Sequence, residues 1–151
     1  MHIPHIIKKG HCTMKDMFCF QCQQTAHNTG CEGKAGVCGK KADTANYQDE
    51  IIGALIGLAR AAKNGRPTES TDALVEKALF TTITNVNFDP QTVDQLTESI
   101  HAACPGIGFD YDMANLWHEP DEDIRSLKSF VLFSLRLSLI HISEPTRPRL
   151  I

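Results

Sequence analysis

The 151-residue sequence lacks the features of a membrane, secreted or nucleic-acid-binding protein. It has no apolar run of about 18 residues, the length that a transmembrane helix requires. No apolar segment followed by a small-residue cleavage site precedes the cysteines, so nothing indicates secretion. The net charge of −3 has mixed signs, and the few aromatic residues are scattered, so there is no basic or stacking surface for nucleic acid. We expect a soluble protein of one domain's length in the reducing cytoplasm.

Four of the six cysteines, by contrast, lie in one glycine-rich stretch with the spacing C-x2-C-x8-C-x6-C: Cys19, Cys22, Cys31 and Cys38. The stretch has neither helical nor alternating apolar periodicity, which predicts a loop. Two cysteines separated by two residues can direct both sulfurs at one centre, and the glycines leave backbone N–H groups free to point at sulfur. The loop therefore predicts a metal centre.

The spacing leaves three alternatives for these cysteines. Soft thiolates select zinc, copper(I) or iron–sulfur clusters over hard cations. A structural zinc site usually joins two short knuckles, or one knuckle and a His pair. Here six residues separate the second cysteine pair, and His27 lies between the pairs, so an iron–sulfur cluster fits better than zinc. Disulfides or free thiols are the third alternative, which a reducing compartment disfavours.

Several sequence blocks resemble the N-terminal part of the hybrid cluster protein family, also called prismane protein or hydroxylamine reductase. They are Met17-Phe-Cys-Phe-Gln-Cys-Gln-Gln-Thr25, Gly30-Cys31, Gly36-Val-Cys-Gly-Lys40 and Thr44-Ala-Asn-Tyr-Gln-Asp49. A weaker similarity continues to about Arg136. The cysteine block is the specific part of this resemblance, because the helical remainder alone would not identify the family.

The resemblance implies that Cys19, Cys22, Cys31 and Cys38 bind the family's N-terminal cluster, which is [4Fe-4S] in some members and [2Fe-2S] in others. The short gap between the second and third cysteines favours [4Fe-4S]. The cluster would pass electrons from an external reductase to a catalytic hybrid iron–sulfur–oxygen cluster, where hydroxylamine becomes ammonia and water. Residues of later domains bind that second cluster, so we assign no catalytic residue here and expect the fragment alone to be inactive. The alternative is a zinc-stabilised four-cysteine binding or interaction module without redox function.

Apolar periodicity and capping signals after the cysteines predict a mainly α fold, in which a cysteine-rich cluster-binding loop precedes an incomplete helical bundle. The first helix is expected from Asp43 or Thr44 to about Gly65, with Gly53 and Gly57 allowing close packing on a neighbouring helix. The second begins at Ser70 or Thr71 and weakens at Thr81.

Two more helices and a loop complete the prediction. The third helix has Asp89 as its cap and Pro90 as its first residue, and it stops before Pro105-Gly106. The segment 106–120 is expected to be a loop that packs on the bundle. A fourth helix begins after Pro120, with acidic residues in its first turn.

These features divide the chain into four segments: a non-family extension (1–16), the iron–sulfur loop (17–42), a truncated helical domain (43–136) and a terminal artefact (137–151). The residues Leu137-Ser-Leu-Ile-His-Ile-Ser-Glu-Pro-Thr-Arg147 match the in-frame translation of a transposase sequencing adapter at every position. A bundle interrupted in its fourth helix would expose apolar faces, so we expect self-association or poor solubility.

Two minor metal-site candidates have no completing ligands. One is the N-terminal tail with His2, His5, His11 and Cys12, which has no fixed ligand spacing. The other is the pair His101 and Cys104, three residues apart on the predicted third helix. Both are expected to be non-functional.

Overall fold

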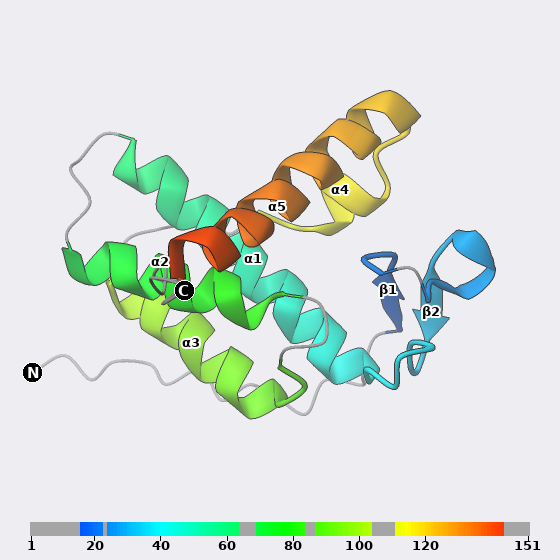
Figure 1. Ribbon diagram of the computed structural model, residues 1–151, viewed down its shortest axis with the longest axis horizontal. Coiled ribbons are helices and arrows are strands. Elements are labelled where there is room, and N and C mark those ends of the chain that lie inside the picture. Colours follow the sequence, from blue (N-terminus) through cyan, green and yellow to red (C-terminus); the bar gives the residue numbers. More distant parts are fainter. Residues whose placement is uncertain (1–15, 23, 64–68, 84–86, 104–110, 144–151) are drawn as a thin grey trace, which may run out of the picture.

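Helices dominate the computed structural model, which describes residues 16–22, 24–63, 69–83, 87–103 and 111–143 (Figure 1). Within these ranges a two-stranded antiparallel hairpin precedes five α-helices. The elements are β1 (Met17–Cys19), η1 (Ala26–Asn28), β2 (Cys31–Gly33), α1 (Ala42–Ala62), α2 (Glu69–Thr81), α3 (Pro90–Ala103), α4 (Ala114–Trp117) and α5 (Glu122–Ser143). The predicted mainly α fold is confirmed.

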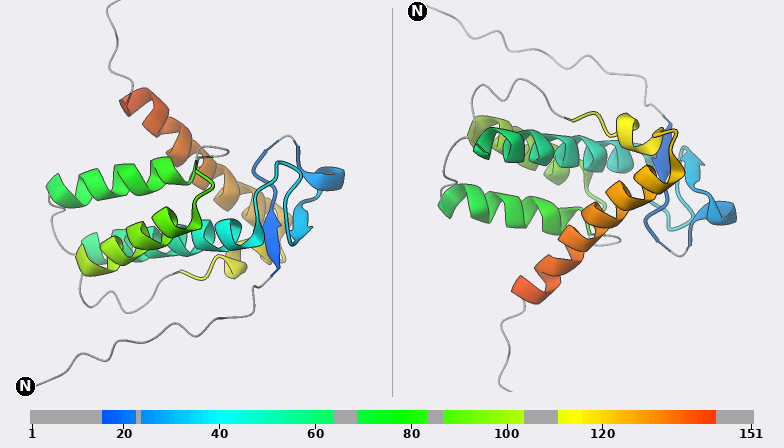
Figure 2. Two further views of the ribbon diagram at one scale, coloured as in Figure 1. Left: turned by 90° about the horizontal axis from the view of Figure 1, so that it is seen from below. Right: turned by 90° about the horizontal axis from the view of Figure 1, so that it is seen from above.

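Helix α1 is the centre of the core. Figure 2 shows α1, α2 and α3 side by side, with α5 crossing them at an angle and the β1–β2 hairpin beside the first turns of α1. Apolar side chains of α1 interlock with one stripe of α3 and with Ala78 of α2. The largest fully buried members are Ile51, Ile52, Val93 and Ile100. Burying side chains of this size stabilises the fold by about 1.5–3 kcal/mol each.

The start of α1 differs from the prediction. Neither Asp43 nor Thr44 caps the helix, because both lie inside its first turn and the capping position is Lys41. Two backbone contacts fix the chain just before the helix. Ala35 and Lys41 form an antiparallel bridge, and the Ala42 N–H donates to the Lys34 carbonyl (3.0 Å), so the helix begins at Ala42. A contact with the preceding loop therefore sets this boundary.

The start of α3 agrees with the prediction. Asp89 precedes the helix and Pro90 is its first residue. The Gln91 backbone N–H donates to Asp89 Oδ1 (3.0 Å), and the Thr92 hydroxyl donates to Asp89 Oδ2 (2.5 Å). The aspartate thus satisfies one of the free N–H groups at the helix start.

The segment predicted as a loop contains a helix, α4, in its described part, 111–120. The Asp112 side chain accepts a hydrogen bond from the Ala114 N–H (2.9 Å) and so closes the turn. Met113, Leu116 and Trp117 are buried, which confirms that this segment packs on the bundle. The helix is only four residues long, too short to show periodicity in the sequence.

Gly53 of α1 allows a close backbone approach, although not by a neighbouring helix as predicted. The Tyr111 N–H donates to the Gly53 carbonyl (3.1 Å). A Cβ atom on Gly53 would lie 2.3 Å from the Tyr111 carbonyl oxygen. The glycine therefore lets the segment that leads into α4 lie directly on α1.

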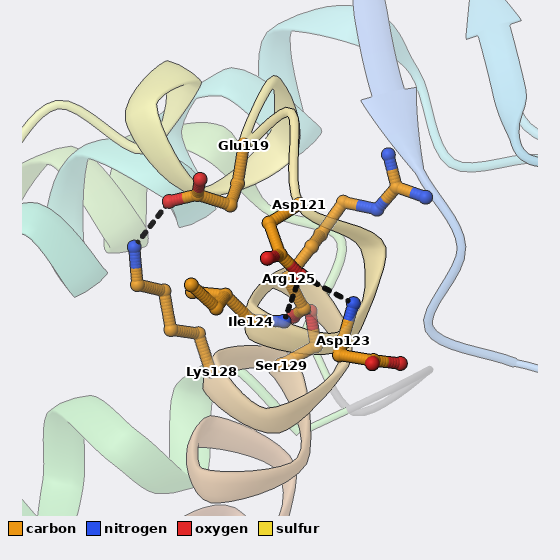
Figure 3. A network of polar contacts seen from close by, with 7 residues as sticks. All are labelled: Glu119, Asp121, Asp123, Ile124, Arg125, Lys128 and Ser129. Carbon is orange, nitrogen blue, oxygen red and sulfur yellow. Dashed lines mark hydrogen bonds and ion pairs between the residues drawn. The ribbon is translucent and has the colours of Figure 1, made fainter.

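The start of α5 is fixed by polar contacts that Figure 3 shows. Asp121 Oδ1 accepts hydrogen bonds from the backbone N–H groups of Asp123 (3.0 Å) and Ile124 (3.1 Å). One turn later Lys128 Nζ contacts Glu119 Oε2 at 2.6 Å. The helix runs on to Ser143, within the segment predicted to be translated adapter, and that division of the chain stays a prediction. No helix in the described ranges is both long and apolar enough to span a membrane.

Candidate metal centre

The β1–β2 hairpin places two of the four predicted ligands opposite each other. Cys19 pairs with Cys31 in the antiparallel register, so both side chains leave the same face of the hairpin. This face packs on the first turns of α1, against Ala42 and Ala45. Cys31 is buried and Cys19 is half-buried.

The other two predicted ligands lie in turns on either side of β2. Cys22 begins a turn in which the Thr25 N–H donates to the Cys22 carbonyl (3.1 Å). Cys38 lies in a turn that the Gly39 N–H closes on the Gly36 carbonyl (2.9 Å), and Gly39 adopts a positive φ of 86°. A Cβ atom on Gly36 would lie 3.7 Å from Cys31 Sγ, so this turn packs directly beside that cysteine.

The four cysteines are all free thiols. Four soft donors without disulfides are chemically suited to an iron–sulfur cluster or zinc. Among the residues described, however, no three His, Cys, Asp or Glu side chains converge closely enough to hold a metal ion. The structure brings Cys19 and Cys31 together, and the complete four-cysteine site stays a prediction.

Buried positive charges lie close to Cys19. Burial raises the pKa of the Cys19 thiol, whereas the positive charge of Lys40 acts to lower it. Lys40 is itself buried, and its Nζ donates to Gln48 Oε1 (2.7 Å). Arg136 of α5 is also buried and interacts electrostatically with Cys19. Both cations favour the thiolate form of this cysteine, the form that binds metal.

Aromatic side chains on either side of Cys19 pack against the helical bundle. Phe18 and Phe20, the two neighbours of Cys19 in sequence, contact the ring of Trp117 with centroids 6.0 and 5.1 Å apart. The Trp117 Nε1–H donates to Asp49 Oδ2 (3.1 Å). Burial raises the pKa of Asp49 to about 6, although Trp117 and Arg136 oppose this shift.

Lys40, Asp49 and Arg136 were not recognised as site residues from the sequence. Lys40 and Asp49 end two of the blocks that carry the family resemblance, and that position was the available signal. Arg136 comes from the far end of the described chain and has no local signal. Of the minor candidates, His101 is exposed on α3, and Cys104 and the N-terminal tail lie outside the described residues.

Comparison with known proteins finds a family model that matches most of the chain. Residues 17–138 match the Prismane/CO dehydrogenase family, a range that begins at β1 and ends just inside the predicted adapter segment.

Similar proteins are named hydroxylamine reductase. The protein from Syntrophobacter fumaroxidans is 50% identical over 155 residues, covering 80% of this chain and 28% of its own length. The Bacteroides thetaiotaomicron protein is 36% identical over 146 residues (80% and 27%). The Nitratidesulfovibrio vulgaris protein is 52% identical over 77 residues (48% and 14%). The chain thus spans only about a quarter of the length of its better-covered relatives, and it belongs to the Prismane/CO dehydrogenase family.

Proposed function

We propose that this chain is the electron-transfer module of a hydroxylamine reductase-like oxidoreductase, and that Cys19, Cys22, Cys31 and Cys38 bind an iron–sulfur cluster. The observation that carries the proposal is the set of four free thiols within the family match. The names of the relatives support the substrate, hydroxylamine.

The residues around Cys19 suit a bound cluster. A cluster held by four thiolates carries net negative charge, which a protein interior disfavours unless it is compensated. Lys40 and Arg136 provide buried positive charge at this position. The aromatic group of Phe18, Phe20 and Trp117 anchors the hairpin on the bundle. The hairpin that carries Cys19 and Cys31 would therefore be held in place on the helical bundle.

The cluster, when bound, accepts and donates single electrons. We propose [4Fe-4S], with [2Fe-2S] as the alternative, an external reductase as electron donor, and a cytoplasmic location. In the complete enzyme two electrons and two protons would convert hydroxylamine to ammonia and water at a second, hybrid cluster. We assign none of that cluster's ligands to this chain, so the chain by itself is expected not to consume hydroxylamine.

Anaerobic reconstitution with iron and sulfide tests this proposal. The reconstituted protein should show broad visible absorption and an EPR signal on reduction, and Ser at any of the four cysteines should weaken or abolish both. Cys12→Ser and Cys104→Ser are matched controls and should leave the spectra unchanged. Spectra unaffected by Cys19→Ser and Cys31→Ser together would contradict the proposal.

A further inference from the structure

Charged side chains from three parts of the chain interact electrostatically with Cys19. Lys40 belongs to the loop before α1, Asp49 to α1 and Arg136 to α5. Lys40 and Arg136 are only 3% and 5% exposed, and Asp49 is half-buried. A charge in such surroundings acts through space with little screening by water or salt. These groups can therefore affect a bound cluster without contacting it.

Backbone and side-chain contacts fix Lys40 beside the cysteine hairpin. The Gly36 N–H donates to the Lys40 carbonyl (2.8 Å), and a Cβ atom on Gly36 would lie 3.7 Å from Cys31 Sγ. Cys31 is the residue that pairs with Cys19. The Lys40 ammonium donates to Gln48 Oε1 (2.7 Å). Because this acceptor is uncharged, the contact leaves the positive charge of Lys40 in place.

Arg136 brings a second cation to the same cysteine. It lines one small hollow together with Phe20 and Gln21, the two residues that follow Cys19. Its Nη2 atom is buried without a hydrogen-bond partner among the described residues. Asp49 interacts with Arg136 electrostatically, but its carboxylate accepts the Trp117 Nε1–H instead of forming an ion pair. Two buried cations thus outnumber one carboxylate at this position.

We propose that these charges set the reduction potential of the cluster, with Lys40 and Arg136 raising it and Asp49 lowering it. One-electron reduction makes a bound cluster more negative by one charge, so a nearby cation stabilises the reduced form and a nearby carboxylate destabilises it. Net charge is among the factors that set iron–sulfur potentials. This role rests on the proposed electron-transfer function, and it names the side chains that determine how readily the module accepts an electron.

The midpoint potential of the anaerobically reconstituted chain tests this proposal, measured at pH 8 by titration with dithionite and followed by EPR. Lys40→Met and Arg136→Met should each lower the equilibrium constant for one-electron reduction about tenfold, which is about 59 mV toward more negative potential. Asp49 is ionised at this pH, so Asp49→Asn should shift the potential in the opposite direction.

Charge-conserving and exposed variants are the controls. Lys40→Arg and Arg136→Lys keep the charge and should stay close to the parent potential. Lys41→Met removes the charge of an exposed neighbour of Lys40, and Arg60→Met that of an exposed arginine in the last turn of α1. High salt screens exposed charges much more than buried ones. At high salt both exposed variants should therefore match the parent, whereas the shifts in Lys40→Met and Arg136→Met should persist.

Several results would overturn the proposal while leaving the cluster in place. One is an unchanged potential in Lys40→Met and Arg136→Met. Another is a potential in Asp49→Asn that is not more positive than that of the parent, and this variant decides if neither cation variant binds a cluster. A third is a potential in Lys40→Arg and Arg136→Lys as low as in the Met variants, because packing and not charge would then be responsible. A parent chain that binds no cluster would overturn the electron-transfer function as well.

Discussion

At the scale of single residues, the environment of Cys19 is the most distinctive feature. Three charged side chains interact with this cysteine: Lys40, Asp49 and Arg136. Lys40 and Arg136 are buried, and Asp49 is half-buried and accepts a hydrogen bond from the Trp117 Nε1–H. Charges removed from water are costly unless they compensate each other or a bound group. Their arrangement is therefore the local feature that mutations should affect most.

Asp49 should make stability depend on pH in an unusual direction. Its pKa rises from 3.8 to about 6 on folding, so the unfolded chain releases this proton first. The contribution of Asp49 is thus most favourable below pH 4 and is lost as pH rises through about 6. Asp49→Asn should then be more stable than the parent at pH 8, by roughly 1–3 kcal/mol, and about equal to it at pH 4.

Urea unfolding at the two pH values, comparing parent with variant, measures this difference directly. Asn can still accept the Trp117 Nε1–H, so the comparison isolates the charge. A variant that is less stable than the parent at pH 8 would show that attraction to Arg136 and Lys40 outweighs burial.

The effect of replacing Gly53 on stability can also be predicted. Ala should stabilise a helix interior by about 1 kcal/mol relative to Gly, but at this position its Cβ would lie 2.3 Å from the Tyr111 carbonyl oxygen. Gly53→Ala should therefore lower stability by about 1–3 kcal/mol, measured by thermal unfolding. Ala59→Gly, at an exposed position of the same helix, calibrates the propensity effect. An unchanged or raised midpoint in Gly53→Ala would contradict the close approach.

At the scale of secondary-structure elements, neighbouring residues determine where some helices begin, and contacts with distant residues determine where others do. Asp89 and Pro90 begin α3 as predicted, because the cap involves only neighbouring residues. The start of α1 was missed, since the bridge from Ala35 to Lys41 sets it.

The cap of α3 can be tested at this scale. Asp89→Ala removes the acceptor for the Gln91 N–H and the Thr92 hydroxyl and should lower the melting temperature, whereas Asp89→Asn should retain most of the cap. These hydrogen bonds lower the pKa of Asp89, so the aspartate's extra benefit should disappear as pH falls into the acid range. Equal melting of the Ala and Asn variants at neutral pH would mean that Pro90 alone begins the helix.

The candidate site was also only partly predictable. The cysteine spacing predicts the four thiols as ligands without any structure, and that set of four stays a prediction. The cations could not be found in this way, because Arg136 reaches Cys19 through the packing of α5 across the molecule.

At the scale of the whole molecule, α5 carries an exposed apolar row. The most exposed members are Leu127 (65%), Phe130 (67%) and Val131 (57%). A contiguous apolar surface on a soluble protein favours association. The chain is therefore expected to self-associate, as sedimentation velocity over a range of concentrations would show.

Replacing the row should reverse this behaviour. Leu127→Lys combined with Val131→Lys should shift the protein toward monomer, whereas Ser126→Lys adds charge at an exposed position of α5 that is not part of the apolar row. A parent chain that sediments as a single monomer at all concentrations would contradict the expectation.

Counting metal and sulfide shows whether the four cysteines hold an iron–sulfur cluster. The measurement is iron, zinc and acid-labile sulfide per chain on protein purified without oxygen, together with a variant that combines Cys19→Ser, Cys22→Ser, Cys31→Ser and Cys38→Ser. We expect about four iron and four sulfide in the parent and neither in the variant; two of each would indicate the smaller cluster. One zinc per chain without sulfide would contradict an iron–sulfur cluster and leave a zinc-stabilised module in its place.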